Sequence, residues 1–246
     1  KLKIAAIQCT ISDSEDENVL KISGLIKDAA KQGAKMILPP ELFQGFYFCR
    51  HEDDKFFKRA QSVQESRLLK HFSSLATDLG VVLPISFFEK EGPHYYNSLV
   101  VFDSDGKNLG LYRKSHIPDG PGYEEKYYFK PGNTGFKVWN TRFGRLGVGI
   151  CWDQWFPECA RIMALKGAQV LMYPTAIGSE PKDPTLDTRL QWRRAMIGHA
   201  VCNALPVLAS NRIGVEEGQS FYGNSFICDH AGNLLADMDD KKEGVL

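Results

Sequence analysis

The chain has 246 residues, of which 43% are hydrophobic and 24% charged, ordinary proportions for a globular protein. A chain of this length can bury a sizeable core, and we expect one α/β domain over residues 1–246. The 30 basic residues balance the 30 acidic ones, which excludes a strong net field that would attract nucleic acid or an acidic membrane surface.

The termini and the cysteines narrow the class of protein further. Residues 1–8 are typical of a strand and lack the apolar core of a secretion signal, and no apolar run approaches the roughly 18–20 residues that span a membrane. We therefore expect a cytoplasmic protein without a membrane or nucleic-acid partner. The six cysteines form no dense framework and no C-x-x-C pair, which favours reduced thiols and argues against a metal site.

Strand and helix patterns alternate along the chain, with turn residues between them. The predicted strands span residues 4–9, 35–38, 81–88, 97–102, 108–112, 146–150, 169–173, 207–210 and 221–228. The predicted helices begin at the capping boxes 14–17 and 62–65, at Pro157 and at Thr185, and end near Gly33, Gly80, Gly167 and Asn203. Residues 113–135 show no periodicity, and long ordered loops of this kind tend to be functional.

Two strand–helix–strand units resemble each other: one ends in Pro39–Glu41 and the other in Tyr173–Pro174. Such units predict parallel strands with helices packed on the sheet. Sites in these sheets gather where the strands end. Glu41, Lys114 and Cys151 each follow a predicted strand, so we expect their side chains to converge.

Cys151 is the candidate nucleophile of this site. A lone cysteine is more often a buried structural thiol, but here a strand with glycines precedes it and a turn into a helix follows, which favours an exposed thiolate. A thiol nucleophile needs a base, either His116 or a carboxylate such as Glu41 with a raised pKa. Lys114 would stabilise a developing oxyanion, although each of these residues by itself could be an ordinary surface residue.

Three short segments resemble the active-site motifs of the nitrilase superfamily. They are residues 38–42 (LPPEL), 112–116 (YRKSH) and 149–153 (GICWD). Four longer segments are similar to one branch of that superfamily, the N-carbamoylputrescine amidases: residues 41–49, 113–129, 151–158 and 173–181. The resemblance covers almost the whole chain.

The resemblance implies a four-layer α-β-β-α sandwich, a homo-oligomer, and an enzyme without a metal or organic cofactor. It implies that Glu41 is the general base, that Lys114 stabilises the oxyanion and that Cys151 is the nucleophile. A second carboxylate at the site is expected from Glu125 rather than from its neighbour Glu124.

The implied reaction is hydrolysis of a small ureido substrate, N-carbamoylputrescine, to putrescine, carbon dioxide and ammonia, as in polyamine biosynthesis. Tyr47, Trp152 and Glu180 are the expected substrate-binding residues, with Glu180 paired to the ammonium of the substrate. The alternatives are an amidase or an N-carbamoyl amino acid hydrolase of the same fold. A different class is a non-catalytic or redox-sensing protein in which Cys159 resolves an oxidised Cys151.

Two segments differ from the family pattern. The chain ends at residues 243–246, apparently within a strand, where relatives continue with a further strand, a helix and a tail. The loop at residues 215–219 is short. Both differences concern the rim of the pocket and the subunit interface, and they leave the expected triad intact.

Overall fold

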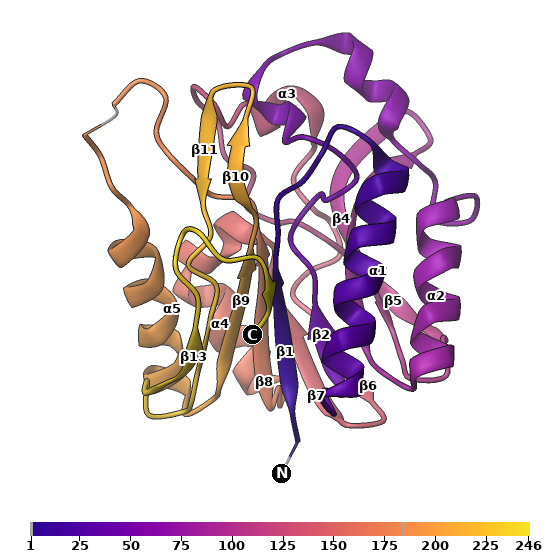
Figure 1. Cartoon of the computed structure of the whole chain (residues 1–246), viewed down its shortest axis with the longest axis vertical. Helices are drawn as coiled ribbons and strands as arrows, with labels where there is room; N and C mark the ends of the chain where they lie inside the picture. Colours follow the sequence, from indigo (N-terminus) through magenta and orange to yellow (C-terminus); the bar gives the residue numbers. More distant parts are fainter. Residues whose placement is uncertain (1, 184) are drawn as a thin grey trace.

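Two β-sheets face each other, and helices cover the outer face of each sheet in a four-layer α-β-β-α sandwich (Figure 1). The computed structural model describes residues 2–183 and 185–246. The strands are β1 (Ile4–Gln8), β2 (Met36–Leu38), β3 (Leu83–Glu91), β4 (His94–Phe102), β5 (Asn108–Arg113), β6 (Val138–Thr141), β7 (Gly144–Val148), β8 (Val170–Thr175), β9 (Val207–Asn211), β10 (Ile213–Glu216), β11 (Gln219–Tyr222), β12 (Phe226–Cys228), β13 (Leu234–Asp237) and β14 (Gly244–Val245). The helices are α1 (Glu15–Lys31), α2 (Arg67–Leu79), α3 (Glu125–Tyr128), α4 (Pro157–Leu165) and α5 (Arg189–Asn203), with 3₁₀ turns at Phe48–Arg50, Asp54–Arg59 and Cys151–Trp155.

The first sheet has the strand order β14-β1-β2 followed by β3-β4-β5. Backbone hydrogen bonds join its two halves, since the N–H of Val82 donates to Lys35 O at 2.8 Å and the N–H of Ile37 donates to Val82 O at 3.1 Å. The second sheet has the order β13-β12-β9-β8-β7-β6, with β7, β8 and β9 parallel. The two repeated units are therefore β1-α1-β2 and β7-α4-β8, one in each sheet.

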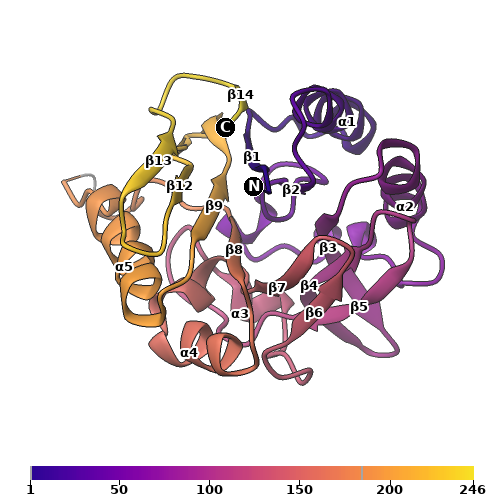
Figure 2. The same ribbon diagram turned by 90° about the horizontal axis from the view of Figure 1, so that it is seen from below.

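The central core lies between the two sheets and the outer cores lie under the helices (Figure 2). Leu38 and Leu99 of the first sheet pack with Val148 and Met172 of the second, and all four are fully buried. Because successive strand residues point to opposite faces, the other face of each sheet packs against α1 and α2 or against α4 and α5. No helix among residues 2–183 and 185–246 has the length and apolar character to cross a membrane.

The helix predicted from residue 14 begins as expected. The Oγ of Ser14 accepts the N–H of Glu17 at 3.3 Å, and Gly33 takes a left-handed φ of +91° after the helix. The start predicted at 62–65 is wrong, because that segment closes a turn of its own. The cap of α2 is Ser66, whose Oγ accepts the N–H of Leu69 at 3.1 Å.

Two other predicted boundaries are also wrong. The strand predicted at 221–228 is divided by Gly223 and Asn224, whose φ angles of +56° and +58° break the extended backbone between β11 and β12. The helix predicted from Thr185 begins at Arg189.

The short loop at 215–219 is the end of the β10–β11 hairpin, which projects above the sheets beside α3 (Figure 1).

The inter-sheet core should dominate the stability of the fold. We expect Leu99→Ala to lower the free energy of unfolding by about 2–5 kcal/mol, because a cavity would open between the two sheets. The matched control is Leu20→Ala on α1, where the side chain is 77% exposed and the change should stay within about 0.5 kcal/mol. Urea denaturation followed by circular dichroism measures both, and equal effects would contradict the assignment of the core.

Candidate active site

Four predicted residues meet at the strand ends near the β10–β11 hairpin. Glu41 follows β2, Lys114 follows β5, Cys151 follows β7, and Glu125 begins α3 within the segment 113–135. Three of these side chains come from the first sheet and its loops, and the thiol comes from the second sheet. The site therefore depends on the way the two sheets are held together.

Lys114 lies at the centre of the cluster. Its Nζ donates to Glu41 Oε1 at 2.9 Å and to the two oxygens of Glu125 at 2.9 and 2.8 Å. The side chains of all three residues are fully buried. Burial by itself lowers the pKa of Lys114, but the charges of Glu125 and Glu41 outweigh it and hold that pKa well above its ordinary value.

Asn97 and Tyr47 complete the polar contacts of the two carboxylates. Asn97 Nδ2 donates to Glu41 Oε1 at 2.7 Å and to Glu125 Oε2 at 3.3 Å, and the Tyr47 hydroxyl donates to Glu125 Oε1 at 2.6 Å. Glu41 Oε2 is buried and has no hydrogen-bond partner among residues 2–183 and 185–246. Because both Lys114 and Asn97 hold Oε1, the other oxygen of Glu41 is the one available to accept a proton.

The thiol of Cys151, the expected nucleophile, rests in its protonated form. Burial raises its pKa well above the ordinary value, the charges of Glu41 and Glu125 raise it further, and Lys114 only partly opposes them. The 3₁₀ turn that begins at Cys151 does not supply the helix N-terminus from which the sequence suggested a thiolate. Cys151 therefore needs a base at the moment of attack.

Asp153 holds the turn on which Cys151 lies. Its Oδ2 accepts the N–H of Ile150 at 2.9 Å and the hydroxyl of Tyr112 at 2.7 Å, and its Oδ1 lies 2.7 Å from His116 Nδ1. Cys151 itself has a φ of +41°, an uncommon conformation for a non-glycine residue that is concentrated at functional sites. His116 is engaged by Asp153, which leaves Glu41 as the better candidate for the base.

A cavity of about 280 Å³ opens onto the thiol. Its walls combine aromatic, apolar and acidic side chains. They are Tyr47, Pro118, Asp119, Tyr123, Glu125, Cys151, Trp152, Trp155, Ile177, Glu180 and Thr188. The three residues expected to bind substrate, Tyr47, Trp152 and Glu180, all line it, whereas Glu124 does not.

Two residues of the site were not among the candidates from the sequence. Asn97 is the first residue of the strand predicted at 97–102, and its neighbour Ser98 is also polar, so the sequence gave no reason to expect a buried amide there. Asp119 resembles a loop carboxylate in a Pro- and Gly-rich segment. Cys159, considered as a partner for Cys151, is fully buried in the core under α4 and α5, and all six cysteines are free thiols.

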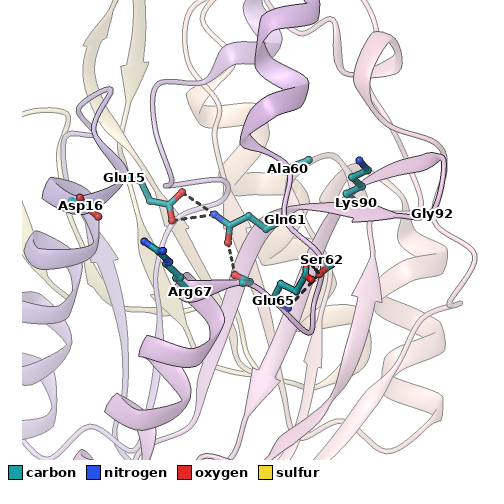
Figure 3. A pocket seen from close by; sticks show the side chains of 10 residues that line it. Glu15, Asp16, Ala60, Gln61, Ser62, Glu65, Arg67, Lys90 and Gly92 are labelled. Carbon is teal, nitrogen blue, oxygen red and sulfur yellow. Dashed lines mark hydrogen bonds between the residues drawn. The ribbon is translucent and has the colours of Figure 1, made fainter.

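A larger and more open depression of about 750 Å³ lies beside the starts of α1 and α2 (Figure 3). Its polar groups bind one another: Gln61 Nε2 donates to both oxygens of Glu15 at 3.1 Å, and Ser66 Oγ donates to Gln61 Oε1 at 2.5 Å. No cysteine or histidine lines it. In the part of the chain that the structure describes, no group of three His, Cys, Asp or Glu residues could hold a metal ion.

This fold and this cluster define a class of enzyme, the thiol amidohydrolases of the nitrilase superfamily, which act on carbon–nitrogen bonds. Residues 3–246 match the carbon-nitrogen hydrolase family, and the chain belongs to it.

The chain is similar to relatives with two different names. It is 51% identical to the citrullinase of Francisella tularensis over 249 residues, covering 100% of this chain and 87% of that protein. It is 52% identical to the N-carbamoylputrescine amidase of Arabidopsis thaliana over 251 residues, covering 99% and 84%. A carbon-nitrogen hydrolase from Helicobacter pylori G27 superposes with a TM-score of 0.93 at 40% identity, covering 99% of this chain and 87% of that one.

The position of the Lys114 backbone depends on a close contact with Gly132, and this contact can be tested by substitution. The N–H of Gly132 donates to Lys114 O at 2.7 Å, and a Cβ at Gly132 would lie 2.0 Å from Arg113 O. We expect Gly132→Ala to lower kcat by about 10-fold or more, because the backbone that carries Lys114 must move. Gly24→Ala in α1, where nothing lies within 4 Å of the added carbon, is the control and should leave ammonia release unchanged. An unchanged kcat for Gly132→Ala would contradict the need for this close approach.

Proposed function

We propose that the protein hydrolyses N-carbamoylputrescine to putrescine, carbon dioxide and ammonia, with Cys151 as nucleophile. The proposal rests on one arrangement: a carboxylate oxygen that can accept a proton lies in the same site as a cavity lined by acidic side chains. Among the described residues Glu41 Oε2 has no hydrogen-bond partner, and the charge of Glu41 acts on the buried thiol of Cys151. Asp119 and Glu180 line the cavity that opens onto that thiol.

The first step is attack by the thiol. Glu41 Oε2 takes the proton of Cys151 as Sγ bonds to the ureido carbon, and the carbonyl electron pair moves onto oxygen. The ammonium of Lys114 and the backbone N–H of Trp152 stabilise that oxyanion. Lys114 donates to both oxygens of Glu125, so one of these contacts can be exchanged for the oxyanion.

The remaining steps use the same carboxyl group. Protonated Glu41 gives its proton to the departing amide nitrogen, which leaves as ammonia, and a carbamoyl thioester remains on Cys151. Glu41 then takes a proton from water as the oxygen attacks the thioester carbon, and it returns that proton to Sγ as the carbon–sulfur bond breaks. The released carbamate decomposes to the amine and carbon dioxide, a reaction that supplies putrescine for polyamine biosynthesis.

The far end of the cavity suits an ammonium separated from the ureido group by methylenes. Tyr123, Trp152 and Trp155 provide aromatic surface, and Asp119 and Glu180 provide negative charge. Burial raises the pKa of Glu180, which indicates a carboxylate that would gain from a cationic partner.

Citrulline is the second candidate substrate, because one close relative is named a citrullinase. Citrulline carries a ureido group and an ammonium, but it also carries a carboxylate. The described residues that line the cavity include no Lys or Arg to receive a carboxylate. Asp119 and Glu180 would repel it, and the same repulsion disfavours N-carbamoyl amino acids.

The proposed roles of the triad can be tested by substitution. We expect Cys151→Ala to abolish ammonia release from N-carbamoylputrescine without lowering the thermal midpoint, because only the nucleophile is lost. Lys114→Ala and Glu41→Gln should lower kcat, Lys114→Ala by about 10²–10³, since Lys114 acts on charge that develops during the reaction. Activity of more than a few per cent in Cys151→Ala would remove it as nucleophile.

The ammonium site can be tested with a charged and an uncharged substrate. We expect Glu180→Gln to raise KM for N-carbamoylputrescine by about 10-fold or more but to leave KM for N-butylurea unchanged, because only the former needs a counter-ion. Asp78→Asn, an exposed carboxylate on α2 outside this cavity, is the control.

The pH dependence of KM is a second measurement that tests Glu180→Gln. Because burial raises the pKa of Glu180, its charge is lost at a higher pH than usual on acidification. KM for N-carbamoylputrescine should therefore rise as the pH falls through that range, and Glu180→Gln should remove this rise. Equal effects on both substrates would dismiss Glu180, and faster turnover of citrulline by the parent enzyme would dismiss the preference for N-carbamoylputrescine.

A further inference from the structure

A second buried ion pair lies beside the proposed triad. Arg212 follows β9 and is fully buried, and its Nη1 donates to the two oxygens of Glu216 at 2.9 and 3.0 Å. Removing two charges from water costs several kcal/mol per ion unless further hydrogen bonds compensate, so a buried pair is weak evidence for stability alone. The remaining contacts of this guanidinium show what else it does.

Those contacts go to the turn that carries Glu41. Arg212 Nη2 donates to Glu41 O at 2.7 Å and to Leu42 O at 2.9 Å, and Nη1 lies 3.3 Å from Gly45 O. Leu42 has a φ of +45°, a left-handed conformation that is rare for leucine and persists only when its surroundings hold it. The guanidinium therefore holds the strained turn by two carbonyl oxygens at once.

Arg212 also connects the two halves of the site across the sandwich. It follows β9 of the second sheet, which pairs with β8, and β8 pairs with β7, the strand that leads to Cys151. Glu41 follows β2 of the first sheet. The backbone of Glu41 has one other link to the second sheet, from its N–H to Thr175 O at 3.4 Å, which is a long hydrogen bond.

Glu216 extends the same contacts to the second carboxylate. Its Oε2 accepts the N–H of Tyr47 at 2.6 Å, and the hydroxyl of Tyr47 donates to Glu125 at 2.6 Å. The pair thus holds the backbone of Glu41 directly and reaches Glu125 through Tyr47.

We propose that Arg212, oriented by Glu216, is a positioning residue that places the base Glu41 against the thiol of Cys151 across the interface between the sheets. This inference rests on the roles proposed above for Glu41 and Cys151. Arg212 does not line the cavity, so it acts on the reaction through Glu41.

Variants that keep or remove the contacts between Arg212 and the turn of Glu41 distinguish an effect on the position of Glu41 from an effect on the stability of the fold. Arg212→Met alone would leave the carboxylate of Glu216 buried and unpaired, and it could fail to fold. The double variant Arg212→Met/Glu216→Gln removes both charges, whereas Glu216→Gln alone leaves the guanidinium on the carbonyl oxygens of Glu41 and Leu42.

The control removes a more exposed ion pair that has no contact with the turn: the side chains of Arg193 and Asp237 are 16% and 50% exposed. Arg193 Nη2 lies 2.9 Å from Asp237 Oδ2, and its guanidinium lies 5.5 Å from the Phe226 ring, much as that of Arg212 lies 5.4 Å from Phe221. Arg193→Met/Asp237→Asn should leave kcat unchanged.

Three measurements are made on each variant: hydrolysis of N-carbamoylputrescine, alkylation of Cys151 by iodoacetamide across a range of pH, and the thermal midpoint. Relative to Glu216→Gln, we expect the Arg212→Met/Glu216→Gln variant to lose about 100-fold in kcat with little change in KM, because a misplaced base affects the chemical step. Alkylation near neutral pH should slow as well, and the difference should shrink at high pH, where hydroxide takes the thiol proton instead of Glu41.

Two results would overturn the proposal. One is a kcat and a neutral alkylation rate equal to those of Glu216→Gln. The other is a loss that is equal at every pH and accompanied by a lower thermal midpoint, which would make Arg212 a structural residue only. Alkylation needs no substrate, so it decides the role of Arg212 even if the parent enzyme does not hydrolyse N-carbamoylputrescine.

Discussion

The ammonium of Lys114, buried between the carboxylates of Glu41 and Glu125, is the interaction on which the rest of the site depends. All three side chains are fully buried, so their mutual contacts must replace hydration. Burial opposes a resting thiolate at Cys151, and the charges of Glu41 and Glu125 oppose it further. In the proposed reaction, proton transfer to Glu41 would therefore accompany attack, and Lys114 would stabilise the negative charge that then forms on the substrate.

The four-layer architecture explains why so many buried polar side chains surround this cluster. Glu41 and Lys114 come from one sheet and Cys151 comes from the other, and apolar packing between sheets has little directional preference. Hydrogen bonds are directional, so they can fix the relative position of side chains from the two sheets. Asp153 holds the backbone before Cys151, Asn97 selects the free oxygen of Glu41, and Arg212 connects the turn of Glu41 to the second sheet. Each of these side chains is fully buried, where a hydrogen bond is strong and an unpaired group is costly.

The residues that line the cavity have two kinds of proposed role. Cys151 and Glu125 belong to the proposed catalytic cluster, whereas Asp119, Trp155 and Glu180 take no part in bond breaking in the proposed reaction. Relatives with different substrate names can share the first group and differ in the second. In the proposed function, the charge of Asp119 and Glu180, rather than the triad, bears on the choice between N-carbamoylputrescine and citrulline.

The sequence by itself determined the strand–helix–strand units, the family, and the positions of Glu41, Lys114, Cys151 and Glu125, because local patterns and short contiguous motifs carry that information. It misplaced the start of α2, since Ser62 and Ser66 are equally good caps, and it joined β11 to β12 although Gly223 and Asn224 are both residue types that tolerate a left-handed backbone. Only the tertiary structure decided which oxygen of Glu41 is free and what holds its backbone. Asn97 lies 56 residues from Glu41 along the chain and Arg212 lies 171 residues away, so their contacts exist only once the two sheets have packed together.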